Sequence, residues 1–518
     1  MDTGLSSGCQ GSTSLRFPFA RVDPGKQDCR LRTIHSRFSA GPIERHVAEC
    51  ALGHAAIGAL MSHHASQEWG MFIAHGLSAQ EYRETSMSDR AVLVPDDYFL
   101  AAGNSTATVD QRDLEALAIQ VFRQPPVQLA KEEAGRRWKR LAALDITPEA
   151  TASLDELAEE YSFNYVLRAV NSDANYPRVL GHLYGPPHEW FGMKVPGSRG
   201  SGGDGPDSHY TLIPIDSHAR FELTCRRFDP APADVPFTLT GNLSLSMTLG
   251  SLAWDDVQFD PDGTFAITLD PQPANGRPNH IQTKPDTRYL FIRDCRADWR
   301  EMPNGYRVKR LDPPTAAPLT FEQIVERAAR YIVDDVPAMY WFMRLYASLE
   351  ANTMTAPFGT GGVSGLVLQT VSLARLALRD DEAFVVTIGA GGARFRDLVV
   401  HDFWFRTLQY WKRTSNMNNS QGVPNPDGST TYVISLQDPG VHNWLDTGGL
   451  HEVLVVHRWQ GLPRVPRAAD ACWAKGELVK LKDLDRAVPR DMKRVTPAER
   501  QQQLAWRLET FKLRYLDR

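Results

Sequence analysis

The chain has 518 residues, and its 42% hydrophobic and 23% charged content is ordinary for a soluble globular protein of two or three domains. A net charge of -5 and a pI near 6.3, without a polybasic run, exclude nucleic acid and anionic membranes as expected partners. No apolar run approaches the roughly 18 residues of a membrane span, and the first residues lack the apolar core of a signal peptide. We therefore expect a cytoplasmic protein whose partner is a small-molecule substrate or ligand, with homo-oligomerisation left open.

The N-terminal part changes from an irregular segment, residues 1–40, to a mainly helical region, residues 41–195. His46, Cys50 and His54 recur at i, i+4 and i+8 on one helical stripe. Imidazole and thiolate on one face are typical metal ligands, but a Cys and two His packed in a helix interface explain the stripe equally simply. The packing interpretation is preferred. Six cysteines without CxxC spacing favour reduced thiols, and no metal or organic cofactor is predicted.

Residues 205–312 follow a period of two, which is typical of strands. Apolar and polar residues alternate strictly from Arg220 to Arg226, and this places Cys225 in the core. Short strands separated by turns predict an antiparallel β-sandwich or jelly roll. The segment Pro196–Asp207 before them is rich in Gly, Ser and Pro, and it predicts either a flexible link or a long turn that brings backbone close to a ligand.

Helical spacing returns at residues 318–375, where a helical insertion is expected. Thr320 and Gln323 have the spacing of a capping box. Residues 380–463 form a second β region, and residues 464–518 a C-terminal extension with a helix from Thr496. Its expected buried side consists of Leu504, Leu508, Phe511 and Tyr515. The predicted fold class is therefore α+β, with antiparallel sandwich or jelly-roll regions, a helical insertion and helical termini.

The most distinctive stretch runs from Asn416 to Pro463. Asn425–Gly428 has the composition of a turn, and alternation from Thr431 to Leu436 predicts a half-buried strand after it. A loop rich in polar and aromatic residues follows, and an apolar strand, Val453–Trp459, resumes beyond it. Binding residues are found disproportionately on loops that a rigid scaffold holds, so this loop is a candidate site.

Three stretches carry a resemblance to a bacterial protein family. Asp262–Trp299 and Pro426–Gln460, together with Gly202–Asp216 upstream, resemble the family called domain of unknown function 1214, often found with family 1254. The resemblance covers roughly residues 171–462. It implies a jelly-roll or sandwich fold with a helical insertion, and no established reaction. Three positions depart from the family pattern, namely Gly205, His280 and His442.

Candidate acids and bases are expected where a carboxylate can orient an imidazole or stand beside an arginine, because such neighbours tune a pKa toward neutrality. His401 with Asp402, and His442 with Asp446, are the predicted pairs. The candidate catalytic residues are Asp298, His401, Asp402, His442 and Asp446. The candidate substrate-binding residues are Arg293, Trp299, Trp404, Asn443, Trp444 and Arg458. Structural ion pairs, surface histidines and core aromatics are the alternatives for each group. A metal at Asp207, His209, Asp216 and His218 would need further ligands, since His209 is off the strand face of Asp216 and His218.

Two functions of different class follow from these residues. The first is a metal-independent acid–base enzyme, a hydrolase, lyase or isomerase, that acts on a polyhydroxylated or aromatic small molecule. The second is a non-catalytic carbohydrate or metabolite binding protein with a jelly-roll core. The two are distinguished by whether the candidate carboxylates and histidines converge within hydrogen-bond reach in one pocket.

Overall fold

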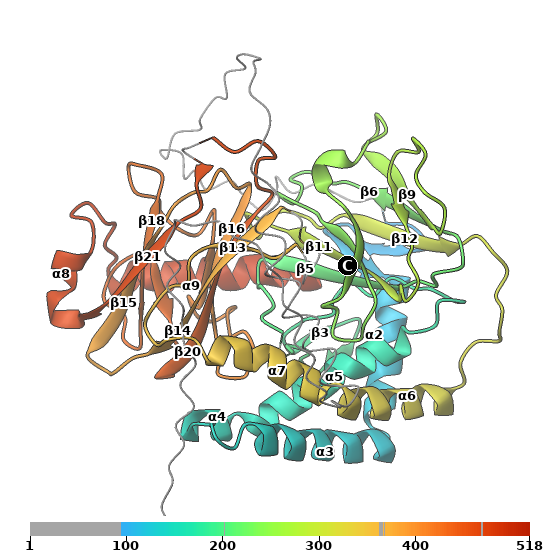
Figure 1. Cartoon of the computed structure of the whole chain (residues 1–518), viewed down its shortest axis with the longest axis horizontal. Helices are drawn as coiled ribbons and strands as arrows, with labels where there is room; N and C mark the ends of the chain where they lie inside the picture. The colour runs from blue at the N-terminus through green and yellow to red at the C-terminus, as the bar shows by residue number, and fades with distance from the viewer. Residues whose placement is uncertain (1–94, 201, 362–365, 367, 468–469, 518) are drawn as a thin grey trace, which may run out of the picture. The chain divides into compact units, whose positions relative to one another are not determined.

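The computed structural model describes residues 95–200, 202–361, 366, 368–467 and 470–517, all within the compact unit Glu84–Arg518 (Figure 1). Helices and mostly antiparallel sheets are both present, so the fold is α+β as predicted. The stripe of His46, Cys50 and His54 lies outside the described residues.

The first pair of sheets is built from residues 208–310. One sheet has the order β5 (Ser208–Pro214), β11 (Tyr289–Cys295), β7 (Phe237–Thr240) and β8 (Thr248–Leu252); the other has the order β10 (His280–Gln282), β9 (Thr264–Asp270), β6 (Phe221–Arg226) and β12 (Gly305–Arg310). Apolar side chains of both sheets, among them Leu223 and Ile292, form one buried core. Cys225 belongs to this core, which confirms its prediction from the alternation.

The second pair of sheets is built from residues 358–480. One sheet has the order β13 (Phe358–Gly359), β14 (Gln369–Ala377), β20 (Glu452–Gln460), β16 (Phe395–His401) and β17 (Asn416–Asn418); the other has the order β19 (Trp444–Asp446), β18 (Thr430–Ser435), β15 (Glu382–Ile388) and β21 (Ala474–Lys480). β14 begins inside the range assigned to a helical insertion, which corrects that boundary. Its buried residues pair with β20 on the sheet interior, where tertiary packing outweighs local propensity.

The helices cover one sheet of each pair. They are α2 (Val109–Phe122), α3 (Pro125–Leu141), α4 (Pro148–Ala152), α5 (Leu154–Val170), α6 (Phe321–Asp334) and α7 (Val336–Ala347). Their apolar faces share one core with Phe291 of β11 and Leu454 of β20, so a single helical layer packs on both β regions. The predicted capping box of Thr320 and Gln323 starts α6. No helix in the described part of the chain is long and apolar enough to cross a membrane.

Apart from the C-terminal helix, the remaining elements are short. They are β1 (Phe99–Ala101), β2 (Asn104–Thr108), β3 (His188–Trp190), β4 (Met193–Val195), α8 (Leu484–Ala487) and single-turn helices at Trp254–Asp256, Leu481–Asp483 and Leu513–Tyr515.

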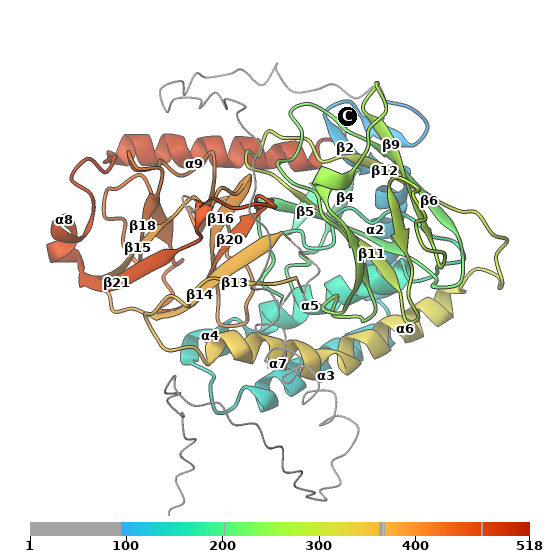
Figure 2. The same cartoon turned by 45° about the horizontal axis from the view of Figure 1, so that its top comes forward.

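The C-terminal helix α9 (Pro497–Lys512) lies on the opposite side of the strands from α3, α6 and α7 (Figure 2). Thr496 and Glu499 form its predicted capping box. Its expected buried face is wrong in part: Phe511 is buried, but Leu504, Leu508 and Tyr515 are half-buried. Arg500, Arg507 and Thr510 are buried instead.

Hydrogen bonds explain why arginines occupy the buried face of α9. Arg500 Nε donates to Asp438 Oδ2 at 2.9 Å, and Arg507 Nε donates to the Tyr410 carbonyl at 2.6 Å. Arg507 Nη2 also donates to the Asn416 carbonyl at 2.9 Å. A buried guanidinium is tolerated only when such acceptors replace water, so α9 is fixed by polar contacts to loops that sequence periodicity does not reveal.

Arg507→Ala is expected to lower the free energy of unfolding by about 3 kcal/mol, because it leaves buried carbonyl acceptors without a donor. The matched control is Glu509→Ala on the exposed side of the same helix, where only a surface pair with Lys512 is lost and a change below about 1 kcal/mol is expected. Urea and thermal unfolding measure both variants. Equal stability of the two would contradict the role given to Arg507.

Candidate functional site

A cleft of about 190 Å³ opens where α4 and α5 meet the segment that follows β16. Its polar lining includes Glu156, Arg199, Asp402, Arg406 and Arg413. Clefts that combine convergent polar groups with apolar walls are the usual form of small-molecule sites.

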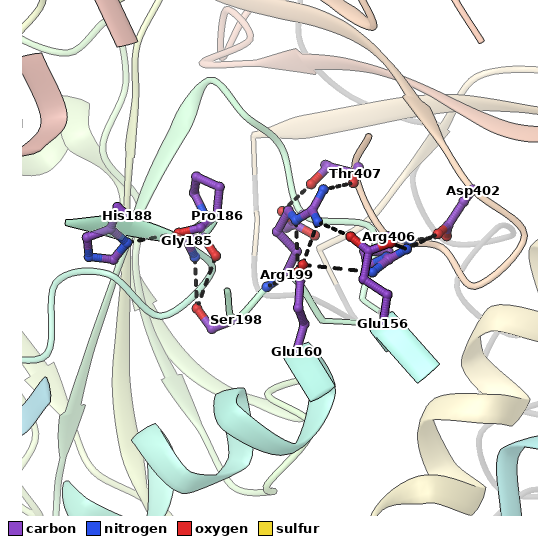
Figure 3. Close-up of polar contacts among 11 residues, drawn as sticks. Glu156, Glu160, Gly185, Pro186, His188, Ser198, Arg199, Asp402, Arg406 and Thr407 are labelled. Carbon is purple, nitrogen blue, oxygen red and sulfur yellow. Dashed lines mark hydrogen bonds and ion pairs between the residues drawn. The ribbon is translucent and has the colours of Figure 1, made fainter. Parts of the chain in front are cut away.

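Arg199 lines this cleft and has hydrogen bonds to Glu156, Glu160 and Thr407 (Figure 3). It is buried, and its Nε donates to Glu160 Oε2 at 2.8 Å while its Nη2 donates to Glu156 Oε1 at 3.0 Å. Its Nη1 donates to the carbonyl of Thr407 at 3.0 Å. Since all of these acceptors are held by other elements, the guanidinium joins α5 to the segment after β16.

Arg406 is the second arginine that binds the carboxylates of this cleft. Its Nε donates to Asp402 Oδ2 at 3.0 Å and its Nη2 to Glu156 Oε2 at 3.0 Å. Glu156 therefore bridges both arginines. Burial would raise the pKa of Glu156, but Arg406 and Arg199 outweigh this and hold its pKa below the ordinary value. The side chain is 51% exposed, so a carboxylate with a fixed negative charge faces the cleft.

Asp204 lies directly behind the cleft wall. Thr407 lines the cleft, and its Oγ1 donates to Asp204 Oδ2 at 3.3 Å. The other oxygen, Oδ1, is buried and has no hydrogen-bond partner among the described residues. Burial raises the pKa of Asp204 to about 7, although Arg199 and Arg458 act in the opposite direction. A carboxyl group that titrates near neutral pH can both donate and accept a proton under physiological conditions.

A buried pair of charged residues fixes the backbone next to Asp204. Asp397 of β16 and Arg458 of β20 are direct partners across the sheet, and Arg458 Nη1 lies 3.2 Å from Asp397 Oδ2. Arg458 also donates to the carbonyl of Gly203. Burial raises the pKa of Asp397 to about 7 despite Arg458. The pair thus holds the chain next to Asp204 in place.

The glycine-rich segment before β5 approaches protein side chains closely. Gly203 has φ +64°, and a Cβ there would lie 2.3 Å from the ring of Phe405. A Cβ at Gly205 would lie 3.0 Å from Asp397 Oδ2. Glycine is therefore required at position 203 by both backbone conformation and space. Of the two sequence predictions, a long turn with close backbone approach fits this segment, and the structure shows that approach to Phe405 and Asp397.

The predicted pairing of His401 with Asp402 is wrong. His401 is buried, and its Nε2 lies 2.9 Å from the carbonyl oxygen of Asp204. Burial, with Arg458 next in weight, lowers its pKa to about 3. The carboxylate of Asp402 binds Arg406 and the backbone N–H of Trp404 instead. Consecutive residues at the end of a strand point to opposite faces, which explains why adjacency in sequence does not produce a pair.

The predicted pairing of His442 with Asp446 is also wrong. His442 Nε2 lies 3.2 Å from the carbonyl of Gln421, and burial, with Lys493 next in weight, lowers its pKa to about 4. Asp446 accepts from Arg413 Nη1 at 2.8 Å and from the backbone N–H of Gly448 at 2.7 Å. Asp446 is the last residue of the short strand β19, whereas His442 lies in the loop before that strand, so the two side chains have different partners.

The other candidates are distributed over several parts of the molecule. Asp298 pairs with Arg300 at 2.6 Å in the loop after β11. The predicted substrate-binding residues are held by contacts inside the protein. Trp299 Nε1 donates to Asp207 Oδ1 at 2.7 Å, and Trp404 Nε1 donates to the Ala150 carbonyl at 2.9 Å.

Three others are held in the same way. Asn443 Nδ2 donates to the Val423 carbonyl at 2.7 Å, and Trp444 Nε1 donates to Ser435 Oγ at 3.0 Å. The guanidinium of Arg293 lies 4.2 Å from the ring centroid of Phe291.

The structure thus brings only some of the candidates together. Asp402 lines the cleft, Asp446 binds its lining residue Arg413, and Trp404 binds its lining residue Ala150. His401 and Arg458 adjoin Asp204 behind the wall.

Sequence reasoning missed Asp204, Glu156, Glu160, Arg199 and Arg406. The glycine-rich segment around Asp204 was the one signal in the sequence, because a long turn that brings backbone close to a ligand was one of its two predicted forms.

No group of His, Cys, Asp and Glu within the described ranges could hold a metal ion. The predicted set of Asp207, His209, Asp216 and His218 is not gathered. Asp207 is buried against Trp299 and Asn416, whereas the side chain of His218 is 89% exposed. Cys225, Cys295 and Cys472 are free thiols.

Comparison with known proteins adds a likeness of fold. A solved structure of an uncharacterised protein from Burkholderia cenocepacia is similar with a TM-score of 0.56 and 22% identity, over 70% of this chain and 99% of that one. The VPA0106 protein from Vibrio parahaemolyticus matches at a TM-score of 0.34 and 9% identity, over 71% of this chain and 100% of that one. No family model and no curated protein matches the chain. At this identity the first likeness indicates a shared fold and nothing about activity.

Asp204→Asn is expected to change how stability depends on pH. The folded protein keeps the Asp204 proton up to about pH 7, whereas the unfolded chain releases it near the ordinary aspartate pKa of 3.8. The proton count is then higher in the folded state, so this group lowers stability as pH rises from about 4 to 7. Relative to wild type, the variant should gain up to about 4 kcal/mol over that range.

Unfolding by denaturant at pH 4.5, 6 and 8 measures this difference. The control is Asp260→Asn, which replaces an exposed aspartate and should follow the wild-type pH dependence. Parallel curves for Asp204→Asn and wild type would show that the Asp204 carboxyl does not titrate near neutrality.

Proposed function

We propose that the cleft binds a small polyhydroxylated or aromatic molecule and that the chain acts on it by acid–base chemistry, with Asp204 as the proton-transfer group. The observation that carries the proposal is the Asp204 carboxyl: it is buried beside the cleft, one oxygen lacks a partner among the described residues, and its pKa is about 7. Groups with these properties are concentrated at functional sites.

The charges of the cleft support a hydroxylated ligand over an anion. Arg199 and Arg406 are matched by Glu156, Glu160 and Asp402, so their positive charge is already neutralised. What remains is a set of donors and acceptors, which suits hydroxyl groups because each of them can use both.

The size and the walls of the cleft further limit which ligands can fit. Phe403, Leu408 and Leu450 also line it and supply an apolar surface for the face of a ring. Its volume of about 190 Å³ is below the ~300 Å³ of common drug-sized pockets. We infer a ligand with a single ring.

Thr407 connects Asp204 to the cleft for proton transfer. Its hydroxyl donates a hydrogen bond to Asp204, and the residue lines the cleft. When Asp204 is ionised, it accepts the Thr407 hydroxyl proton as that oxygen takes a proton from the substrate; the reverse sequence returns it. Removal and return of a proton at one position is the step shared by hydrolases, lyases and isomerases.

A non-catalytic binding protein is the second candidate. It is favoured by the absence of the two predicted histidine–carboxylate pairs and by the partners that His401 and His442 have instead. On this alternative, the Asp204 carboxyl contributes to packing, and the cleft binds its ligand unchanged.

The proposal extends to architecture and relationship. The two facing pairs of sheets, each with a common apolar core, support a description as two β-sandwiches. We also propose that the chain is related to the domain of unknown function 1214 family. We further propose that the protein is located in the cytoplasm and that its chemistry is independent of metal.

Glu156→Gln is expected to weaken ligand binding about tenfold, because it removes the exposed acceptor charge from the cleft. Calorimetry and ligand-observed NMR with D-glucose, D-galactose, myo-inositol and catechol measure the affinity. The matched control is Glu159→Gln, which lies on the same helix and pairs with Lys131 outside the cleft. If none of the four probes binds, or if both variants lose affinity equally, the ligand class is wrong.

Asp204→Asn separates the two functions. For an enzyme, we expect turnover of the bound probe to fall by a factor of about 10² to 10⁴ while affinity changes little. The wild-type rate should also show an inflection near pH 7, the pKa of Asp204. NMR detection of product after prolonged incubation measures turnover. Binding without any product in wild type would favour the non-catalytic protein.

A further inference from the structure

A second cavity, of about 330 Å³, lies between α6 and the start of β11. It is lined by Leu243, Arg288, Tyr289, Arg330, Tyr331 and Asp334. None of these residues lines the cleft beside Asp204. The larger of the two cavities is therefore a separate place at which a ligand could bind.

The arginines of this cavity differ from those of the cleft. Arg288 and Arg330 are exposed, and neither forms an ion pair with any residue that the structure describes. Arg330 lies 5.8 Å from the ring centroid of Tyr331, which orients its guanidinium without neutralising it. Two such guanidinium groups at one cavity match the paired oxygens of a carboxylate.

Asp334 adds the opposite charge to the same cavity. It is exposed and forms no ion pair within the described ranges, so it has not paired with Arg288 or Arg330. Its carboxylate would repel a simple anion such as phosphate but would attract an ammonium group. The three charges together suit a molecule that carries both signs.

The rest of the lining is apolar or aromatic. Leu243 and the rings of Tyr289 and Tyr331 offer a surface for a hydrophobic group. Burial, and then the neighbouring Tyr331, raise the pKa of Tyr289 above its ordinary value, so its hydroxyl stays neutral. Tyr289 therefore adds a hydroxyl group to the cavity without further charge.

We propose that this cavity binds a small zwitterion of the α-amino-acid type with an apolar or aromatic side chain. Arg288 and Arg330 take its carboxylate, Asp334 takes its ammonium group, and Leu243 with the tyrosine rings contacts its side chain. This site is additional to the proposed function of the cleft and does not depend on it.

Calorimetric titration with L-phenylalanine tests the proposal. Two matched probes accompany it: 3-phenylpropionate, which lacks the amine, and 2-phenylethylamine, which lacks the carboxylate. L-Leucine with 4-methylpentanoate and 3-methylbutan-1-amine repeats the comparison without an aromatic ring. We expect at least one amino acid to bind about tenfold or more tightly than both of its analogues.

Substitutions test which charged side chain of the cavity binds which charged group of the amino acid. Arg330→Gln and Arg288→Gln should each weaken amino-acid binding about tenfold or more, and Asp334→Asn should do so while improving binding of the amine-free acid. The control Arg140→Gln removes an exposed positive charge from the end of α3 and should have no effect. Circular dichroism and thermal unfolding verify that each variant is folded.

The proposal is overturned if neither amino acid binds the wild-type protein, or if affinity is unchanged in the Arg288 and Arg330 variants. It is also overturned if the amine-free acids bind as tightly as the amino acids, because Asp334 would then have no ligand role. Asp204→Asn should leave amino-acid binding unchanged, so failure here is distinguishable from failure of the proposed function of the cleft.

Discussion

The fold depends on one buried carboxylate, that of Asp207, just before β5. It accepts hydrogen bonds from Trp299 at 2.7 Å, Asn416 at 2.7 Å and Asn418 at 2.9 Å. Trp299 follows β11 in the first pair of sheets, and both asparagines belong to β17 in the second. Arg507 of α9 binds Asn416 from the other side. One carboxyl group thus joins both β regions and the C-terminal helix, because the oxygens of a buried carboxyl group must accept hydrogen bonds wherever donors are available.

This junction also determines where chemistry is feasible. The segment that carries Asp207 carries Asp204 three residues earlier, so the contacts of Asp207 help to hold Asp204 behind the cleft. Arg199, a little further upstream, meets Glu156 and Glu160 of α5. The cleft therefore lies where the helical layer, the glycine-rich segment and the end of β16 meet. Its polar groups are fixed before any ligand arrives, which reduces the ordering cost of binding.

Much of the architecture follows from local pattern. Alternation located β6 and β18, although β18 is buried on both faces and not on one, and two capping boxes marked where α6 and α9 begin. The site was less accessible, because adjacency in sequence is a poor guide to pairing at a strand end. His401 and Asp402 turn to different partners, and so do His442 and Asp446. Asp397 and Arg458 form a true pair across 61 positions of the chain, and only strand register brings them together.

The sequence by itself determined the α+β class, several of the longer strands, both capping boxes and the burial of Cys225, since these depend on periodicity and neighbouring residues. Tertiary structure alone decided which faces of α9 are buried and where the ionisable groups meet. A helical pattern predicts that Arg500 and Arg507 are exposed to solvent. In the structure both are buried, because loops distant in sequence pack on them and supply hydrogen-bond acceptors. The pKa of Asp204 likewise depends on burial by segments some 200 residues away, and desolvation of this kind has no signature in the local sequence.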